Sequence, residues 1–333
     1  MKPRIYLHAG MHKTGTSAIQ KWAKNNRETL ENHGLYYPDY EPFAEMRING
    51  HMQFTHAIAG KDSQLTFDEC VKLSSKWYDD TLQKNCDVFF SAESIFRHFI
   101  KSKETDPRKL YLQRIKELFK GFEVIPVLVF RRPDSFIESL YKETVAKPAP
   151  QLPNLIDWAK TKFHLKYTEN LLRYKEVFGS VIVLTYENLR DSDNFVQKFF
   201  TQMGFSIEAN FDEEKVRQSL TVSQIIVKNY ANKYISNRSE NEHFKHWLKI
   251  NKELIHASFD GGHASLWDSP EKKSAFLENF PLEEFYNVAD IVSDKKKFPP
   301  TKQVIENFVT TIPEVLARRV DEFFSKGDSQ QGY

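Results

Sequence analysis

Four short apolar runs, each separated from the next by a helical pattern or a loop, constrain the fold more than any other feature of the sequence. They cover residues 5–9, 86–91, 124–130 and 181–184. Strands that alternate with helices pair in parallel through right-handed crossovers. We therefore expect an α/β fold: a three-layer sandwich with a mostly parallel central sheet. Pro126 counts mildly against this interpretation, because proline cannot donate a hydrogen bond inside a central strand.

The character of the sequence changes after about residue 195. A helical stripe over 195–203 ends at Gly204, and the later segments read mainly as helix, at 213–235, 240–257 and 302–326. We expect residues 1–210 to form the α/β core. Residues 211–333 then form a helical C-terminal region that completes the fold, and the two together make one compact domain.

Composition excludes several classes of protein. The 333 residues carry 47 Lys and Arg against 45 Asp and Glu, a balance that argues against a nucleic-acid-binding protein. Hydrophobic residues make up 40% and charged residues 28%, which excludes intrinsic disorder. The two cysteines, Cys70 and Cys86, cannot build a disulfide framework or a four-thiolate zinc site.

No apolar run approaches the ~18 residues that a membrane-spanning helix needs, so we expect no integral membrane segment. At the N-terminus, Lys2 and Arg4 are followed by only three apolar residues before the polar His8. A secretory signal would have a longer apolar stretch and a cleavage site. We therefore expect a cytoplasmic protein. The sequence leaves the oligomeric state open.

The strongest local signal is the segment 10–17, Gly-Met-His-Lys-Thr-Gly-Thr-Ser, between the first strand and the first helix. Glycines let the backbone turn tightly, and the N–H groups at a helix start bind anions. Lys13 adds a cation, and Thr16 and Ser17 add hydroxyl groups. The pattern predicts a P-loop-like phosphate loop. It is not a Walker A sequence, in which lysine directly follows the second glycine, because Thr16 stands there.

A second constellation follows the third strand. Arg131 stands at the carboxyl end of the strand, Pro133 suits the first position of a helix, and Ser139 lies about two turns along that helix. Ligands of parallel sheets bind at the carboxyl ends of the strands. We therefore expect Arg131 and Ser139 to reach a ligand held by the 10–17 loop. Two anion sites at one edge indicate a nucleotide with phosphates at two places.

These segments resemble the PAPS-dependent sulfotransferases, in particular bacterial members with a P-loop-like fold. Gly10-x-x-Lys13-x-Gly15-Thr16-Ser17 is similar to their 5′-phosphosulfate loop. Arg131-x-Pro133, with Ser139 and Tyr141 at the right offsets, is similar to their 3′-phosphate motif, although Phe136 replaces the usual second arginine. A third segment, Tyr-Glu-Asn-Leu at 186–189 and the helix after it, resembles the family's Y-E-D-L. The resemblance covers about residues 4–220.

The resemblance implies transfer of a sulfuryl group from PAPS to a hydroxyl or amine, with PAP as product and no metal. The acceptor would be a small molecule or glycan, with a carbohydrate or glycolipid favoured. The residues implied to hold the donor are the following: His12, Lys13, Thr14, Gly15, Thr16, Ser17, Arg131 and Ser139. Lys13 would also act in catalysis, because a cation near the departing phosphate oxygen counts for more as the bond breaks.

Two residues are candidates for the general base. Glu93 directly follows the second strand, where many sulfotransferases carry His or Glu. His51 belongs to a Gly-His pair that bacterial relatives often show after the first helix. The sequence does not decide between them, and Glu93 could also orient His51. We expect residues 40–65 and the C-terminal region to wall the acceptor cleft.

Two other functions stay open at this stage. A P-loop kinase would transfer phosphoryl from ATP to a small molecule, with Glu93 binding Mg²⁺; the position of the lysine argues against it. A non-catalytic module would bind PAP or a sulfated glycan. The pair His243 and His246 has a spacing that zinc can use, but we interpret it as a surface pair because no third ligand is near in the sequence.

Overall fold

A computed structural model of the chain describes residues 2–61, 63–101, 106–209, 220–259, 263–291, 296–299 and 308–327. Two compact units make up the chain. The sheet unit consists of Met1–Arg132, Lys166–Glu213 and Leu282–Pro299. The helical unit consists of Pro133–Leu165, Glu214–Pro281 and Pro300–Tyr333. The sequence predicts a single boundary near residue 210. In the structure, three segments of each unit alternate along the chain.

The sheet unit contains a five-stranded, all-parallel sheet in the order β2-β3-β1-β4-β5. Its strands are β1 (Arg4–His8), β2 (Leu35–Tyr36), β3 (Asp87–Ser91), β4 (Glu123–Phe130) and β5 (Ile182–Thr185). The predicted α/β class and the four predicted strands are confirmed. The edge strand β2 was not predicted, because two residues are too few to give a strand pattern.

Proline fits in the central strand β4 because of where the neighbouring strand β5 begins. The backbone N–H and C=O of Val127 face β1, because its carbonyl accepts a hydrogen bond from the N–H of Ala9. The backbone of Pro126 therefore faces the β5 side, where pairing starts only at Val127 opposite Ile182. The missing N–H lies one residue before the ladder begins, so it costs no hydrogen bond.

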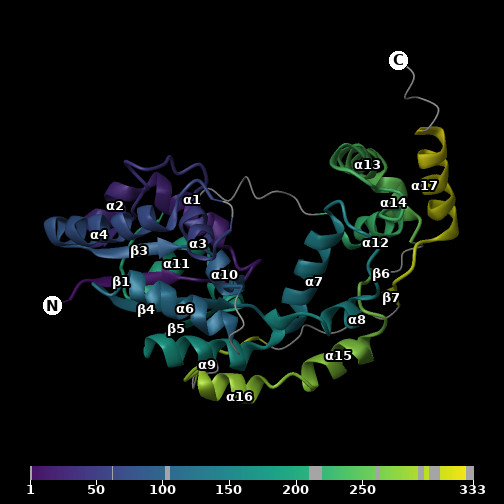
Figure 1. The fold of residues 1–333 in the computed structure, drawn as a ribbon. Helices are drawn as coiled ribbons and strands as arrows, with labels where there is room; N and C mark the ends of the chain where they lie inside the picture. Colours follow the sequence, from purple (N-terminus) through teal and green to yellow (C-terminus); the bar gives the residue numbers. More distant parts are fainter. Residues whose placement is uncertain are drawn as a thin grey trace. The chain divides into compact units, whose positions relative to one another are not determined.

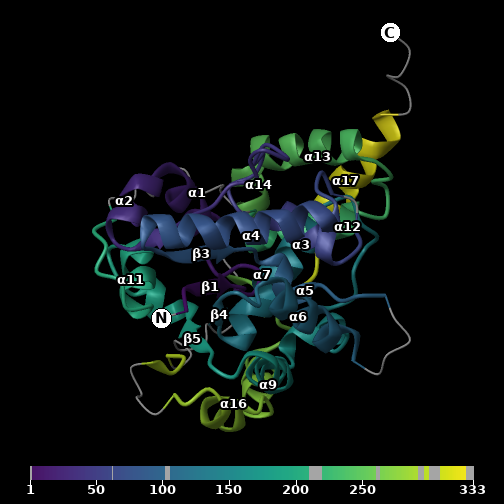
Figure 2. The same ribbon diagram turned by 60° about the vertical axis from the view of Figure 1, so that its left-hand side comes forward.

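Helices cover both faces of the sheet, which is consistent with a three-layer sandwich. One face carries α1 (Thr16–Asn25), α2 (Arg27–Asn32) and α11 (Phe195–Gln202). The other carries α3 (Met52–Ile58), α4 (Phe67–Lys84), α6 (Pro107–Leu118) and α9 (Tyr167–Phe178). Figure 1 gives the element order, and Figure 2 shows the strands between the two groups of helices. Right-handed crossovers explain why the helices divide between the two faces. The connection from β1 to β2 runs toward one edge of the sheet, whereas the connections from β2 to β3, β3 to β4 and β4 to β5 run toward the other edge, so their helices lie on the opposite face.

Aromatic side chains fill the sheet unit. The residues Phe195, Phe199 and Phe200 of α11 are buried, as the helical stripe predicted. On the other face, the ring of Trp77 packs 5.8 Å from that of Phe90, and the ring of Phe54 contacts both, tilted against Trp77 and edge-on to Phe90. Many of the 27 phenylalanines in the sequence thus serve the core. The remaining short helices of the unit are α5 (Ser94–Arg97), α10 (Tyr186–Arg190) and α16 (Leu282–Val288).

The helical unit has two hydrophobic clusters and a two-stranded parallel sheet. Its helices are α7 (Pro133–Val145), α8 (Leu155–Ala159), α12 (Val222–Ala231), α13 (Arg238–Ile250), α14 (Lys252–Ala257), α15 (Pro270–Glu278) and α17 (Glu314–Gly327). Its strands are β6 (His263–Ala264) and β7 (Phe308–Val309). The helices expected over 213–235 and 302–326 are present in part. Residues 213–219 and 302–307 lie outside the described residues.

Within the described part of the chain, we find no helix with both the length and the apolar character needed to cross a membrane.

Candidate functional site

The loop between β1 and α1 is fixed against the sheet. Its first residues run along β4, with the N–H of Ala9 donating to Val127 and that of Met11 to Val129. Gly15 has a φ of 78° and forms the N-cap of α1. A Cβ at this position would lie 2.4 Å from the Phe195 ring, so the site needs glycine for space as well as for conformation.

The start of α1 has the geometry of an anion site. The N–H groups of Ala18 and Ile19 donate to the carbonyl of Gly15, so those of Thr16 and Ser17 precede the hydrogen-bond ladder of the helix. The positive end of the helix dipole lies at the same place. Thr14 is buried, and its hydroxyl donates to the carbonyl of Met11 over 2.6 Å, which ties the loop to itself.

Lys13 also has a left-handed backbone, with a φ of 65°. Its carbonyl accepts a hydrogen bond of 2.9 Å from Nη1 of Arg131, the residue that follows β4. The guanidinium of Arg131 lies 4.8 Å above the ring of Tyr186, and the hydroxyl of Tyr167 donates to the carbonyl of Arg131 over 2.6 Å. The structure therefore brings Arg131 to the 10–17 loop and holds it there from two further elements.

The Tyr-Glu-Asn-Leu segment, which forms α10, supports the same corner. The backbone N–H of Arg132 donates to both carboxylate oxygens of Glu187, at 3.0 and 3.1 Å. The Arg132 guanidinium donates to the carbonyl of Pro299. The sequence pattern identified this segment, but it did not indicate that Glu187 fixes the chain after β4 or that Tyr186 lies under Arg131.

The residues of the second motif that follow Arg132 lie on α7, in the helical unit. Pro133 begins that helix, as predicted. The Tyr141 hydroxyl donates to the carbonyl of Pro153, and Phe136 is fully buried with its ring near that of His164. Phe136 thus packs inside the helical unit. Ser139, which the sequence predicted as a ligand contact, is on the same helix. It therefore belongs to the helical unit and not to the residues of the sheet unit that make up the candidate site.

His51 is a structural residue in this fold. Its side chain is fully buried, and its ring stacks on Phe90 with centroids 4.3 Å apart. Its Nδ1 accepts from the backbone N–H of Ser91, at 3.1 Å, and Nε2 lies 3.0 Å from the carbonyl of Pro38. Burial lowers the pKa of His51 to about 3. Because the backbone engages both ring nitrogens, the role of general base considered for His51 does not fit this geometry.

Glu93 has a different environment. It follows β3, adopts a helical backbone at the N-cap of α5, and keeps 29% of its side chain exposed. One carboxylate oxygen lies 3.4 Å from Nδ1 of His12, which stands on the 10–17 loop. β3 is paired with β1, and the N–H of Ala92 donates to the carbonyl of His8, so this pairing sets Glu93 beside the loop.

A buried polar network lies beneath the loop. Nδ1 of His8 lies 2.9 Å from the hydroxyl of Ser91, which also accepts from the side chain of Gln20. Burial lowers the pKa of His8 to about 3. A Cβ on Gly10 would lie 2.9 Å from Nε2 of His8, so glycine is required there too. Nothing in the sequence pattern indicates a role for His8.

No protein-family model matches the chain, and a search of the curated proteins finds no match. The function is therefore inferred from the site itself and from the motifs in the sequence. In the sheet unit, the helix N-terminus, Lys13 and His12 follow β1, Arg131 follows β4, and Glu93 follows β3 within 3.4 Å of His12.

Proposed function

We propose that the protein is a PAPS-dependent sulfotransferase that moves a sulfuryl group to a hydroxyl or amine of an acceptor. The favoured acceptor is a carbohydrate or a glycolipid. One observation carries the proposal. The 10–17 loop and Arg131, which belong to two separate motifs of the resemblance, are joined by a hydrogen bond across 118 positions of sequence. The two phosphate contacts of one nucleotide would then come from one corner of the sheet.

Each residue of this corner has a task in the proposed reaction. The first-turn N–H groups and the hydroxyls of Thr16 and Ser17 bind the 5′-phosphate, and the guanidinium of Arg131 binds the 3′-phosphate. Lys13 places its ammonium where negative charge grows on the phosphate oxygen as the sulfur–oxygen bond breaks. An anion-binding corner that also holds a base is what transfer to a hydroxyl requires.

Glu93 is the base in this proposal. The acceptor hydroxyl gives its proton to the Glu93 carboxylate as its oxygen bonds to sulfur, and the electron pair of the broken bond leaves with the PAP phosphate. A carboxylate with 29% exposure can meet an incoming substrate, whereas a fully buried imidazole cannot. His12, 3.4 Å away, is placed to orient the carboxylate.

Calorimetric titration tests the proposal. PAP, and separately ADP with Mg²⁺, are titrated into the wild type, Lys13→Ala and Lys21→Ala. Lys21 is an exposed lysine of α1 and serves as the matched control. We expect PAP to bind, Lys13→Ala to weaken it at least about tenfold, Lys21→Ala to leave it unchanged, and ADP to be inert.

The other outcomes reject the proposal in different ways. Binding of ADP with Mg²⁺ and indifference to PAP would replace it with the kinase. If neither nucleotide bound, the loop would be an ordinary turn, and a module that binds a sulfated glycan would remain. PAP binding without any transfer would support the non-catalytic module.

A further inference from the structure

One side of helix α4 carries apolar residues outside the protein core. The buried side of this 18-residue helix consists of Cys70, Leu73, Ser74, Trp77 and Thr81. A second row of apolar residues, which we call the α4 stripe, consists of Phe67, Val71, Tyr78 and Leu82. Its successive members are four, seven and four residues apart, so they share one face of the helix, about a quarter of a turn from the buried side.

The stripe is exposed and borders a groove. Phe67, Val71 and Leu82 are 42%, 43% and 57% exposed, and Tyr78 is partly buried. The groove, with a volume of about 410 Å³, lies between α4 and the end of α6, and Phe122, which follows α6, lines its other wall. Figure 2 shows α4 over β3, at the outer surface of the sheet unit. A contiguous exposed apolar surface of this kind is typical of a protein interface.

The stripe matches itself when a second copy of the helix runs antiparallel. Reversing the helix end for end would place Phe67 opposite Leu82 of the partner subunit. The same reversal would place Val71 opposite Tyr78 of the partner subunit. Its midpoint falls beside Ser75, a small exposed residue, so two crossing helices could approach closely there. A two-fold axis requires a surface of this kind, because each residue must meet its counterpart in both directions.

The charged residues beside the stripe complement one another in the same arrangement. Lys72 and Asp79 each directly follow a stripe residue, so both lie on one flank of the stripe. Both are exposed, and the ion pairs among the described residues include neither of them. The reversal would bring Lys72 of each copy beside Asp79 of the partner subunit. It would bring Asp68 beside Gln83, so the flank places no like charges together.

We propose that the α4 stripe is a homodimer interface, in which α4 packs antiparallel against α4 of a second copy of the chain. The occupant is a second copy because both the apolar and the charged positions of the face complement their own reversal. The contact extends about 22 Å along the helix, from Phe67 to Leu82. One pair of helices buries less surface than a tight complex does, so the dimer is reversible, with a Kd in the micromolar range. This inference does not depend on the proposed function.

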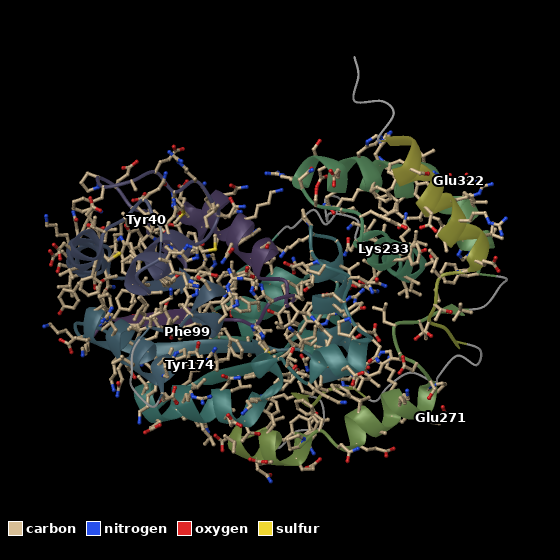
Figure 3. The ribbon with its side chains drawn as sticks, turned by 45° about the vertical axis from the view of Figure 1, so that its right-hand side comes forward. Tyr40, Phe99, Tyr174, Lys233, Glu271 and Glu322 are labelled. Carbon is tan, nitrogen blue, oxygen red and sulfur yellow. The ribbon has the colours of Figure 1, made fainter. Side chains whose placement is uncertain are left out.

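Analytical ultracentrifugation of the full chain, from about 1 to 200 µM, tests the oligomeric state. We expect a dimer whose population rises with concentration. Val71→Glu should weaken this dimer at least about tenfold, because the two-fold axis would place two carboxylates in an apolar contact. Leu172→Glu is the matched control and should leave the dimer unchanged, since Leu172 is a 48% exposed leucine outside the stripe. It lies on α9, the helix that carries Tyr174 in Figure 3.

Charge reversal tests the antiparallel register. Lys72→Glu and Asp79→Lys should each weaken the dimer at least about threefold, because each change places like charges side by side. The variant with both changes should recover the Kd of the wild type within about twofold, because the pair is then restored with its signs exchanged. Both residues are exposed, so these substitutions leave the core of the sheet unit intact.

A disulfide tests the midpoint of the contact. Ser75→Cys, treated with oxidised glutathione, should form a covalent dimer, because the two copies of this position meet near the two-fold axis. The native thiols of Cys70 and Cys86 are buried and do not compete. The inference fails if the wild type stays monomeric over the whole concentration range, or if Val71→Glu dimerises as the wild type does. It also fails if the double charge reversal does not recover the dimer, or if Ser75→Cys forms no covalent dimer.

Discussion

Two polar regions lie at the carboxyl ends of the same strands, and they differ in access to solvent. The buried region contains His8, Ser91 and His51, with both imidazoles fully buried. The accessible region contains His12 and Glu93, whose side chains are 14% and 29% exposed. His8 and Ser91 end β1 and β3, and His12 and Glu93 follow these two strands, at the edge of the sheet where ligands are expected. Position at this edge therefore does not separate the two regions, whereas exposure of the side chains does.

The buried region explains what holds the accessible one in place. Ser91 binds His51 through its backbone and His8 through its hydroxyl, and it directly precedes the turn that carries Glu93. His8 in turn lies against Gly10, the first residue of the loop. We therefore expect changes in the buried region to affect stability first, and changes in the accessible region to affect ligand binding and transfer first.

The largest effect should come from His51→Ala. The change removes a ring stacked on Phe90 and leaves the N–H of Ser91 and the carbonyl of Pro38 buried without their partner. Urea denaturation should show a loss of about 3–4 kcal/mol in the free energy of unfolding. If that variant does not fold, His51→Gln, which keeps a polar end, should lose less. A loss below about 1 kcal/mol in His51→Ala would contradict the structural role.

Acid should destabilise the protein through the buried histidines. Burial lowers the pKa of both His8 and His51 to about 3, whereas the unfolded chain binds the same protons near pH 6.5. Between these values the unfolded state holds more protons, so the free energy of unfolding falls as pH falls from about 6.5 toward 3. Above about pH 6.5 neither histidine makes the free energy of unfolding depend on pH. Each of the two histidines lowers the free energy of unfolding by up to about 1.4 kcal/mol per pH unit in that range.

Histidine variants separate the effect of the buried histidines on acid stability from that of the carboxylates. Unfolding free energies measured from pH 7 to pH 4 should fall less steeply in His8→Gln than in the wild type. Equal slopes in His8→Gln and the wild type would mean that His8 takes up its proton in the folded state.

A smaller effect should appear in Arg131→Lys. Lysine keeps the positive charge but loses the planar fork that binds phosphate with two parallel hydrogen bonds. We expect PAP affinity to fall about tenfold and AMP affinity to stay unchanged, because AMP lacks the 3′-phosphate assigned to Arg131. An equal loss for both ligands would show instead that Arg131 acts through its hydrogen bond to the Lys13 carbonyl and shapes the loop.

The sequence predicted those parts of the fold and site that depend on local pattern. Four strands were predicted because each is a continuous apolar run, and the turn before α1 because its glycines stand where left-handed or close-packed backbone is needed. Burial depends on distant segments, so the sequence could not separate His51 from Glu93. The interleaving of the two units was missed for the same reason: α7 packs on α12, and α16 on α9.

The smallest effect on stability and on PAP binding, and the sharpest contrast with His51→Ala, should come from Glu93→Gln. The His12–Glu93 contact is partly exposed and 3.4 Å long, and such pairs contribute at most about 1 kcal/mol. We expect the unfolding free energy to change by less than about 0.5 kcal/mol and PAP affinity to remain within about twofold, while transfer to any acceptor that the wild type sulfates falls by about 10²–10⁴. Those three readouts distinguish a base from a residue that positions the loop, because a loop-positioning residue would lose PAP affinity together with transfer. A stability loss as large as that of His51→Ala would place Glu93 in the buried region's role and leave the accessible region without its base.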